Sequence, residues 1–487
     1  MNFGLKTNEG LLSSVHKYLL GDPNGNERMC YMFGNYSDDG SLVNIIPMQV
    51  LLPNNLREKD QKATSTYIQF SADFRAYIYG LFLETEFNAI INCHSHPFDK
   101  GSTPFFSYID DQSDLEEAKY LNALDRRTVT KNLLSASMVF SQNGFSMRTN
   151  CFRQKIVRHE VDRVSILGAK FVVSQRNSTN APKHTSIWSR QKDILPNFAK
   201  DTLRNAKIAI VGCGGTGSIT AEHLARLGCH KLTLVDNDIV EITNLNRLQG
   251  AYLRDIGAKK IDTICNHITN INPEIQVNRI DEQFPSMEVI NSLKNSDAIF
   301  SCVDNQWSRS ILNSLCVRYY IPLFDVGTAV TMDDKQKFKW RFNSFIPSDQ
   351  RCFECGRFRN YNSEVVARSL ATKEMRKAFR ERGYVDDADI AAPSVYFLNN
   401  LAVAACMAEF FNFVSGSSRP NISVRGQLGD NGIDVNMHST YDAIMDKPDG
   451  NCPSCGMFLG VADSESIDSL LIRDKDIKFN KGYHGEV

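Results

Sequence analysis

Two histidines and an aspartate in the stretch INCHSHPFDKGSTPFFSYIDD, residues 91–111, have the types and spacing of metal ligands. His94 and His96 follow an apolar run. Alternate residues at a strand end point the same way, so both imidazoles can face one point. A carboxylate from the next loop would be a third ligand, and three protein ligands leave one position of a tetrahedral zinc open for water. Zinc lowers the pKa of that water to about 7. The alternative is that both are surface histidines in a polar loop.

Hydrolysis at such a centre also needs a carboxylate that transfers protons and a donor for the oxyanion. The order His-x-His-Pro followed by Ser-x-x-Asp resembles the JAMM motif of the JAB/MPN metalloproteases, which cleave peptide or isopeptide bonds after ubiquitin-like proteins. The resemblance implies that His94, His96 and Asp110 bind zinc and that Ser107 donates to the oxyanion. Asp111 is a rival ligand. The loop from His96 to Ser107 is longer than eukaryotic members usually show, and bacterial members of this form tolerate it.

The same family uses a glutamate on an early strand as general base. We assign this role to Glu27, which precedes a strand-like run in GNERMCYMFGN, with Glu9 and Glu58 as alternatives. The competing interpretation of Glu27 is an exposed carboxylate in a turn.

A second chemical site is indicated by KIAIVGCGGTGS, residues 207–218, where a strand-like run meets a glycine-rich turn and a helix-like segment. Glycines let the backbone approach phosphates, and a helix N-terminus favours their negative charge. The next strand ends at Asp236, where a ribose hydroxyl would be bound. Alone, this pattern also fits a dinucleotide oxidoreductase or a tight turn without a ligand. The glycines concerned are Gly212, Gly214, Gly215 and Gly217.

The residues that follow favour triphosphate chemistry over hydride transfer. Asn244 and Arg247 come just after the acidic strand end, Lys260 opens a helix-like segment, and Asp304 ends another strand. Two cations would neutralise phosphates and a carboxylate would hold Mg²⁺, whereas a hydride-transfer site has no use for this set.

From about Ser189 to Cys455 the chain closely resembles the ThiF family, whose members include adenylyltransferases of thiamine and molybdopterin biosynthesis and the ubiquitin-activating enzymes. The resemblance implies that Asp236 binds ribose, that Asp304 binds Mg²⁺, and that the phosphates are contacted by Asn244, Arg247 and Lys260. It also implies that Arg190, in the sequence SRQ, reaches the ATP of a partner subunit, and hence a homodimer. The competing interpretation of Arg190 is a solvated linker arginine.

Two Cys-x-x-Cys pairs lie far apart in this region and can close a tetrahedral thiolate site, which with four protein ligands is structural. ThiF-type enzymes carry such a zinc. The four residues are Cys352, Cys355, Cys452 and Cys455.

A thioester cysteine is harder to find. Relatives that pass the acyl group to a cysteine place it shortly before an Ala-Pro pair, here Ala392-Pro393, but this chain has Val385, Asp386 and Asp387 there. Cys406 lies in an apolar helix pattern and Cys213 in the glycine turn, and both suit structural positions better.

The chain must fold these sites within two or three domains, because 487 residues exceed one ordinary core. The polar stretch QRNSTNAPKHTS, residues 175–186, predicts a linker. We expect a mixed α+β, JAB/MPN-like domain over 1–172, a linker over 173–187, and a Rossmann-like ThiF-type domain with a mainly parallel sheet over 188–487. The apolar segment 394–414 is interrupted by Asn399, Asn400 and Glu409, and we interpret it as a buried helix.

Composition limits the expected partners and the cellular location of the chain. The net charge is −1 with a pI near 6.8, which favours neither nucleic acid nor an anionic membrane as partner. No apolar run reaches the ~18–20 residues of a membrane span, and the N-terminus lacks a signal pattern. The 13 cysteines, an odd number, suit reduced thiols in a cytoplasm.

The combined hypothesis is a bifunctional enzyme that cuts after the C-terminal glycine of a ubiquitin-like protein and adenylates that glycine with ATP. Its cofactors would be one catalytic and one structural Zn²⁺ and Mg²⁺, and a conjugating enzyme would be a further partner. Resemblance alone places such fusions in bacterial operons, some of them antiviral. The alternatives are adenylation of a sulfur-carrier protein and an inactive dimeric scaffold.

Overall fold

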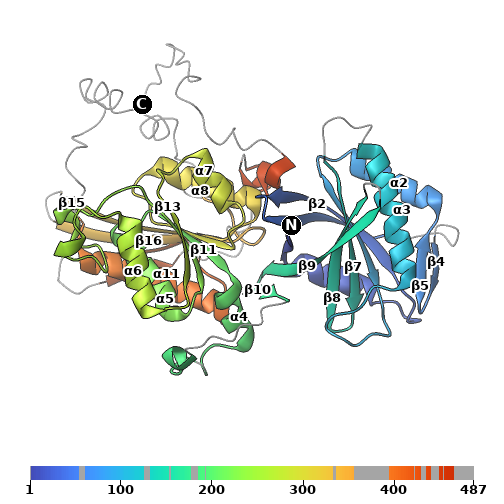
Figure 1. Ribbon diagram of the computed structural model, residues 1–487, viewed down its shortest axis with the longest axis horizontal. Coiled ribbons are helices and arrows are strands. Elements are labelled where there is room, and N and C mark those ends of the chain that lie inside the picture. The colour runs from blue at the N-terminus through green and yellow to red at the C-terminus, as the bar shows by residue number, and fades with distance from the viewer. Residues whose placement is uncertain are drawn as a thin grey trace, which may run out of the picture.

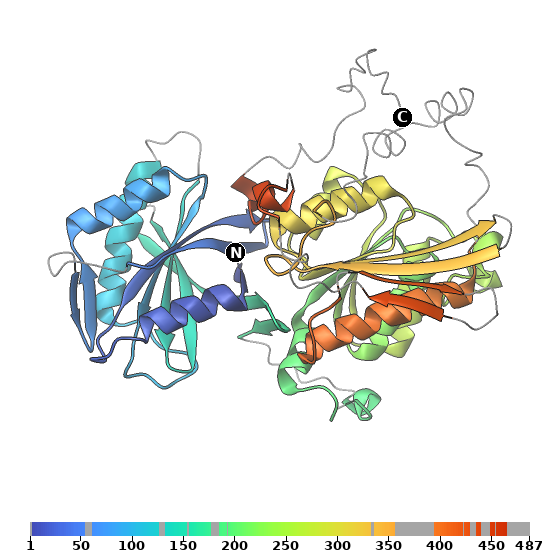
Figure 2. The same ribbon diagram turned by 180° about the vertical axis from the view of Figure 1, so that it is seen from behind.

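The computed structural model describes residues 2–53, 61–125, 132–152, 155–176, 185–191, 193–332, 336–355, 394–421, 423–428, 435–439, 449–452 and 454–464. Figure 1 shows two folded units side by side, with the N-terminus between them. Figure 2 shows the same arrangement from behind. Each unit contains one large sheet with helices against it.

The N-terminal sheet has the strand order β1-β3-β2-β6-β7-β8-β9-β10 and closes on itself, because β1 also pairs in parallel with β9. Its mixed parallel and antiparallel pairing confirms a mixed α+β unit. The strands are β1 (Asn2–Asn8), β2 (Met29–Asp38), β3 (Leu42–Leu51), β6 (Ala89–Ser95), β7 (Leu134–Ser141), β8 (Gly144–Phe152), β9 (Ile156–Leu167) and β10 (Phe171–Gln175), beside a small hairpin of β4 (Gln61–Thr64) and β5 (Tyr67–Phe70).

Alternation along the strands gives this sheet two cores. Met29, Tyr31 and Phe33 of β2 face a cluster that includes residues of α2 (Ala72–Leu83) and α3 (Tyr108–Asp125). The intervening Cys30 and Met32 face the opposite cluster, which includes α1 (Glu9–Leu19). A strand exposes successive side chains on opposite faces, so an uninterrupted apolar strand can be covered by helices on both sides.

The C-terminal sheet has the order β13-β12-β11-β14-β15-β16-β17-β18; the first five strands are parallel, and the last three extend the sheet in antiparallel fashion. This confirms the expected Rossmann-like order of strand, helix and strand. The strands are β11 (Lys207–Val211), β12 (Lys231–Val235), β13 (Gln276–Ile280), β14 (Ala298–Ser301), β15 (Leu323–Met332), β16 (Gln336–Phe345), β17 (Ser423–Leu428) and β18 (Val435–Ser439).

Helices cover both faces of this sheet, with α7 and α8 above it and α5, α6 and α11 below it in Figure 1. They are α4 (Asn197–Asn205), α5 (Gly215–Leu227), α6 (Lys260–Ile271), α7 (Met287–Leu293), α8 (Gln306–Tyr319), α11 (Tyr396–Ser415) and the short α12 (Cys455–Phe458), with 3-10 turns η1 (Thr185–Trp188), η2 (Ile242–Asn244), η3 (Leu253–Asp255) and η5 (Ala462–Ser464).

One helix of the described residues, α11, is long and apolar enough to cross a membrane by length and composition, a test that core helices of soluble proteins also pass. It packs against β15, β16 and α5, and half of its apolar window is buried. This packing agrees with the expected buried helix.

The predicted linker begins too early. Phe171–Gln175 form β10, an antiparallel partner of β9, so the first three residues of the range 173–187 belong to a strand. The side chains of β10 alternate between its two faces, which explains the error. Phe171 and Val173 are fully buried in the core of the C-terminal unit, where the rings of Phe171 and Phe413 stack with their centroids 5.6 Å apart. Residues 177–184 lie outside the described residues.

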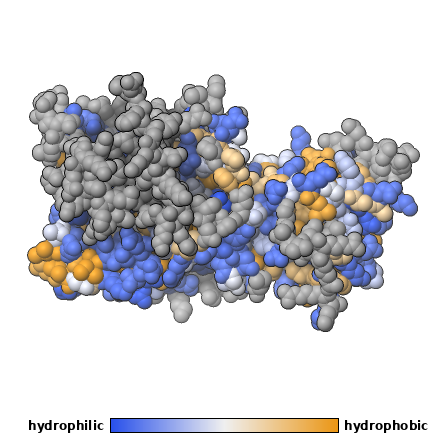
Figure 3. Space-filling view, turned by 90° about the horizontal axis from the view of Figure 1, so that it is seen from above, coloured by the Kyte–Doolittle hydropathy of each residue, from blue (hydrophilic) through white to orange (hydrophobic). Residues whose placement is uncertain are grey.

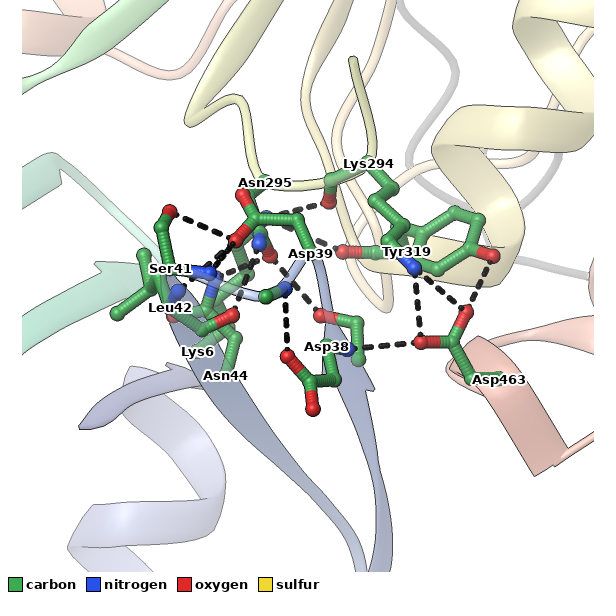
Figure 4. Close-up of polar contacts among 12 residues, drawn as sticks. Lys6, Asp38, Asp39, Ser41, Leu42, Asn44, Lys294, Asn295, Tyr319 and Asp463 are labelled. Atoms are coloured by element: carbon green, nitrogen blue, oxygen red, sulfur yellow. Dashed lines mark hydrogen bonds and ion pairs between the residues drawn. The ribbon is translucent and has the colours of Figure 1, made fainter. Parts of the chain in front are cut away.

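Polar contacts, some of them buried, also join the two units (Figure 4). Lys6 of β1 donates to the backbone oxygen of Ser296 at 2.7 Å, and the Asn295 side chain accepts from Asn44 at 2.6 Å. Asp463 of η5 accepts from Tyr319 at 2.8 Å and from the backbone of Asp38 at 2.7 Å. Residues from near the end of the C-terminal unit therefore tie back onto the N-terminal sheet, and the two units pack directly.

Candidate functional site

The structure brings His94, His96 and Asp110 together. His94 and His96 lie at and just beyond the end of β6, and their Nε2 atoms are 3.1 and 3.5 Å from the two Asp110 carboxylate oxygens. One ligand atom from each residue lies within 4.8 Å of the others, and both histidines are buried. Zinc bonds of about 2.0–2.1 Å at tetrahedral angles separate neighbouring nitrogen and oxygen ligands by about 3.3 Å. The set therefore fits a zinc ion with a position left over.

The Ser-x-x-Asp pattern is also the start of α3. The Ser107 hydroxyl accepts from the Asp110 backbone N–H at 3.2 Å, and the Asp110 carboxylate accepts from the Ser107 N–H at 2.6 Å. These reciprocal bonds are a capping box, which satisfies two free N–H groups at the helix start. The cap holds the carboxylate toward the histidines and leaves the Ser107 hydroxyl hydrogen available to donate.

Asp111, the rival ligand, faces elsewhere. Its carboxylate forms an ion pair with Arg148 at 2.8 Å. Successive helical residues differ in direction by about 100° at 3.6 residues per turn, so adjacent aspartates cannot serve the same point. Burial alone would raise the pKa of Asp110, but hydrogen bonds from His94 and His96 hold that pKa well below its usual range. Burial lowers the pKa of His94, and Asp110 outweighs this and raises it. A metal would compete with protons for these atoms.

Glu27 lies just before β2 and is 4% exposed, so it is not the surface carboxylate of the competing interpretation. Burial raises its pKa to about 7; the nearby His94 opposes the shift and Asp110 adds to it. A pKa near neutrality suits a general base. Glu9 instead begins α1 and accepts from the Ala169 backbone, and Glu58 lies outside the described residues.

Sequence reasoning missed a buried polar layer behind these ligands. Glu117 of α3 is fully buried, accepts from Tyr31 and Asn92 at 2.9 Å each, and has its pKa raised to about 7 by burial. Asp114 pairs with Arg148, which also holds Asp111. The signal was the spacing of acidic residues 110, 114 and 117, which share one helical face.

The rim of the histidine site is aromatic and exposed. Phe98 stacks on His96 with ring centroids 5.2 Å apart and is 51% exposed, and Phe105 lies 5.8 Å from the same ring. Tyr108, at the start of α3, is 77% exposed. Exposed aromatic groups around a polar centre are available for contact with a macromolecular substrate.

The glycine-rich turn after β11 lies where it was predicted. Gly212 has φ +89°, and a Cβ there would meet the Cys302 carbonyl at 2.7 Å. A Cβ on Gly217 would collide with the Gly212 carbonyl, so α5 can approach the turn only without one. Gly215 begins α5, and Gly214 precedes it. Free N–H groups at that helix start can bind phosphate.

The remaining predicted nucleotide residues line one cavity of about 1270 Å³ beside this turn. Asp236 accepts from the backbone N–H groups of Cys213 and Asp238 at 2.7 and 2.8 Å, and burial raises its pKa. Lys260 forms an ion pair with Asp238 at 2.7 Å. The cavity is also lined by Gly212, Gly214, Gly215, Asn244, Arg247 and Asp304.

Arg190 is exposed in the turn after η1 and does not line this cavity, while its neighbour Gln191 donates to the Arg226 carbonyl at 3.1 Å. Its distance from the cavity of its own chain agrees with a role toward a partner subunit, which stays a prediction.

The four predicted cysteines converge and are all buried. Their Sγ atoms are 3.9 Å apart for Cys352–Cys355, 3.7 Å for Cys352–Cys452 and 3.0 Å for Cys355–Cys455. A tetrahedral zinc with bonds of about 2.3 Å separates its sulfur ligands by about 3.8 Å. The donor set fits a structural zinc ion.

Neither Cys213 nor Cys406 has the surroundings of a nucleophilic thiol. Cys213 and Cys406 are fully buried, and burial raises both thiol pKa values well above the ordinary range. A reactive thiol needs the opposite shift. Residues 385–387 and 392–393, where relatives place the cysteine and the Ala-Pro pair, lie outside the described residues.

A buried charge cluster under the cavity was also missed. Asp325 of β15 pairs with Arg309 at 2.8 Å and with Arg341 of β16 at 2.7 Å, and it accepts from Ser301 at 2.8 Å. Asp325 and these three partners come from four separate elements, so no local spacing in the sequence indicated the cluster.

A parallel sheet with a glycine-rich turn, an acidic strand end and two cations at one cavity defines a nucleotide-binding α/β domain. The chain belongs to the ThiF family, which matches residues 189–478. This confirms the ThiF resemblance of the C-terminal region.

Proteins that are similar to this region are enzymes of different kinds. Ubiquitin-like modifier-activating enzyme 5 of Drosophila pseudoobscura pseudoobscura is 26% identical over 238 residues, 46% of this chain and 55% of the relative. The tRNA threonylcarbamoyladenosine dehydratase of Bacillus subtilis (strain 168) is 32% identical over 154 residues, 31% of this chain and 60% of the relative. The chain thus spans somewhat over half the length of these two relatives. The crystal structure of E. coli MccB with ATP aligns at TM-score 0.41 and 23% identity, covering 53% of this chain and 69% of that one.

Proposed function

We propose that this chain processes and activates a ubiquitin-like protein. Its C-terminal unit adenylates a C-terminal glycine carboxylate with ATP, and its N-terminal unit hydrolyses the peptide or isopeptide bond after that glycine. The observation that carries the first activity is the single cavity that collects the glycine turn, the acidic strand end, Arg247, Lys260 and Asp304. Cleavage releases the carboxylate that adenylation consumes, so the two reactions suit one polypeptide.

In the adenylation step, a carboxylate oxygen bonds to the α-phosphorus of ATP while the bond from that phosphorus to the bridging oxygen breaks, and pyrophosphate leaves. Asp236 would hold the ribose, and the free N–H groups at the start of α5 would bind phosphate oxygens. Arg247 and Lys260 would neutralise charge that moves onto the leaving pyrophosphate. Asp304 would hold Mg²⁺, whose charge assists that departure.

In the hydrolytic step, His94, His96 and Asp110 would hold a zinc ion, which supplies an activated water and polarises the scissile carbonyl. Glu27 would accept the proton of the attacking water and deliver it to the leaving amine. The Ser107 hydroxyl would donate to the carbonyl oxygen as it gains negative charge. The aromatic rim of Phe98 and Phe105 would contact the ubiquitin-like domain.

The other features have supporting roles in this proposal. A zinc ion at the four cysteines would tie the segment around Cys352 to the segment around Cys452. Arg190 would act on the ATP of the second subunit in a homodimer. The reaction would take place in a cytoplasm, which the odd number of cysteines supports, and a conjugating enzyme would receive the activated protein there.

Metal analysis and two assays on the full chain test the proposal. We expect two zinc ions per chain and binding of MgATP. The double variant His94→Ala/His96→Ala should lose one zinc and all cleavage of a ubiquitin-like protein fused to a peptide, yet keep pyrophosphate exchange. Asp304→Ala should lose exchange and keep cleavage.

Asp281→Asn is the matched control for Asp304, because this exposed carboxylate pairs with Lys259 and does not line the cavity. It should leave both activities unchanged. A single zinc per chain, held by the cysteines, together with no MgATP binding would refute both activities.

A further inference from the structure

The groups of the hydrolytic site come from two separate elements, because the histidines lie at the end of β6 and the other groups at the start of α3. Reciprocal hydrogen bonds between Ser107 and Asp110 fix these two residues relative to each other. They do not fix the helix relative to the sheet. A zinc ion shared by His94, His96 and Asp110 therefore requires further contacts that hold α3 against the strands, and such outer contacts tune metal sites in general.

Arg148 makes such contacts from the middle of β8. Met147 faces the core on the α1 side, so Arg148 points to the opposite face of the sheet, where α3 packs on β7 and β8 (Figure 1). The Arg148 guanidinium pairs with Asp111 and with Asp114 at 2.8 Å each, and its central carbon lies 3.9 Å from the centre of the Phe106 ring. Hydrophilic and hydrophobic residues are mixed on the face of the N-terminal unit seen in Figure 3, whereas Arg148 is only 5% exposed and lies in the interior.

These three contacts lie on both sides of the site residues along the chain. Phe106 directly precedes Ser107. Asp111 directly follows Asp110, and Asp114 lies three residues beyond Asp111 on the same face of the helix. An arginine carries five donors in a planar fork, so one side chain can hold two carboxylates in a fixed direction, whereas a lysine is a point charge on a flexible stem.

The precision of a zinc site shows why the orientation of α3 matters. Side-chain ends lie about 5–6 Å from a helix axis, so a rotation of α3 by about 10° would move the Asp110 carboxylate by about 1 Å. Metal–ligand distances tolerate only about 0.2 Å. A small change in the seating of α3 on the sheet would therefore be enough to disturb the ligand set.

Other side chains of the sheet also contact this part of α3. Ser137 of β7 donates to Asp114, and Arg158 of β9 donates to the Asp111 carbonyl at 2.7 Å. Each of these contacts involves one residue of the helix, whereas Arg148 contacts two residues of α3 and the ring just before it. Arg148 is therefore the side chain best placed to set both the rotation and the height of the first turn.

We propose that Arg148 is a positioning residue of the hydrolytic site. By joining β8 to the first turn of α3, it holds Asp110 where this carboxylate can share a zinc ion with His94 and His96, and it holds Ser107 toward the carbonyl of the scissile bond. This inference rests on the proposed hydrolytic function. Arg148 itself is buried behind the helix and touches neither the metal nor the substrate.

The test compares Arg148→Lys with the unaltered full chain. Lysine keeps the buried positive charge but lacks the fork that holds two carboxylates. The zinc affinity of the histidine site, measured by competition with a chelator, should fall about 10–100-fold, while the zinc at the four cysteines is retained. At saturating zinc, kcat for cleavage of a ubiquitin-like protein fused to a peptide should fall over the same range. KM should stay nearly unchanged, because Arg148 does not reach the exposed aromatic rim, and pyrophosphate exchange should be unaffected.

Arg176→Lys is the matched control. Arg176 lies just after β10, donates to Ser146 of β8 and pairs with Glu160, so its side-chain contacts within the described part of the chain are with strands and not with α3. This variant should keep the zinc affinity and kcat of the unaltered chain. A second test variant, Phe106→Leu, removes the ring beside the guanidinium without changing charge, and it should weaken zinc binding about threefold.

Unchanged zinc affinity and kcat in Arg148→Lys would overturn the positioning role and leave the hydrolytic function standing. A lower denaturation midpoint without any change in zinc affinity or kcat would assign Arg148 a purely structural role and would overturn it as well. If Arg148→Lys fails to fold and loses both zinc ions, Phe106→Leu decides, and an unchanged zinc affinity in that variant would overturn the proposal. Absence of a second zinc ion or of cleavage in the unaltered chain would refute the hydrolytic function itself.

Discussion

Replacing Asp297 by asparagine should destabilise the protein more than any surface charge change, because it breaks a buried ion pair between the two units. Asp297 precedes β14 and is 2% exposed. Its carboxylate accepts from Arg163 of β9 and from the Lys207 backbone N–H at 2.7 Å. Arg163 also donates to the Asn205 carbonyl at 2.9 Å. Asparagine preserves the shape but leaves the buried guanidinium without a counter-charge.

The expected cost follows from that burial. Removing one partner of a buried pair costs about 3–5 kcal/mol, a large part of the ~5–15 kcal/mol that stabilises a typical protein. With a urea m-value of about 3 kcal/mol per molar, the loss of about 3 kcal/mol lowers the denaturation midpoint by about 1 M. Circular dichroism of the full chain in urea measures this shift.

Two further variants separate the buried pair from ordinary surface charge. Glu160 lies on the same strand as Arg163 and forms an ion pair with Arg176, but the Glu160 side chain is 51% exposed. Glu160→Gln should therefore lower the free energy of unfolding by at most about 1 kcal/mol. Arg163→Met/Asp297→Leu removes both buried charges and should recover most of the lost stability. An unchanged midpoint for Asp297→Asn, or a double variant as unstable as the single one, would refute the reasoning.

Three more predictions concern titration, catalysis and zinc. Burial lowers the pKa of Lys6 to about 8, below its value in the unfolded chain, so the unfolded state binds the extra proton between about pH 8 and 10. The free energy of unfolding should therefore rise with pH over that window, and Lys6→Met should lack this part of the rise; identical urea titrations of both proteins would contradict it. Glu27→Gln should keep its zinc, as measured by metal analysis, and should lose about 10²–10⁴-fold of the cleavage rate. In the unaltered enzyme, the cleavage rate should increase with pH toward and through about 7, where the Glu27 carboxyl deprotonates. Loss of zinc would instead make Glu27 a ligand. Cys355→Ser should remove one zinc and lower the denaturation midpoint while the histidine-site zinc remains, and a midpoint equal to that of the unaltered chain would argue against a structural metal.

Much of both sites could be predicted from the sequence because their motifs are local. His94 and His96 share a direction by strand periodicity, and the glycine turn is defined by consecutive residues between one strand and one helix. The repeated spacing of the two Cys-x-x-Cys pairs was enough to predict their meeting, which the structure shows. The alternation of strand and helix likewise predicted the parallel sheet of the C-terminal unit.

Tertiary structure decided what depends on direction in space and on distant partners. The choice of Asp110 over Asp111 follows from the capping box that sets the rotation of α3. The extent of the linker was mispredicted because β10 buries its apolar face in the other unit. The Asp325 cluster arises from contacts between elements that are separate in the chain. Composition and local spacing carry no information about such pairings, because the energy that selects them comes from contacts that exist only after the chain has folded.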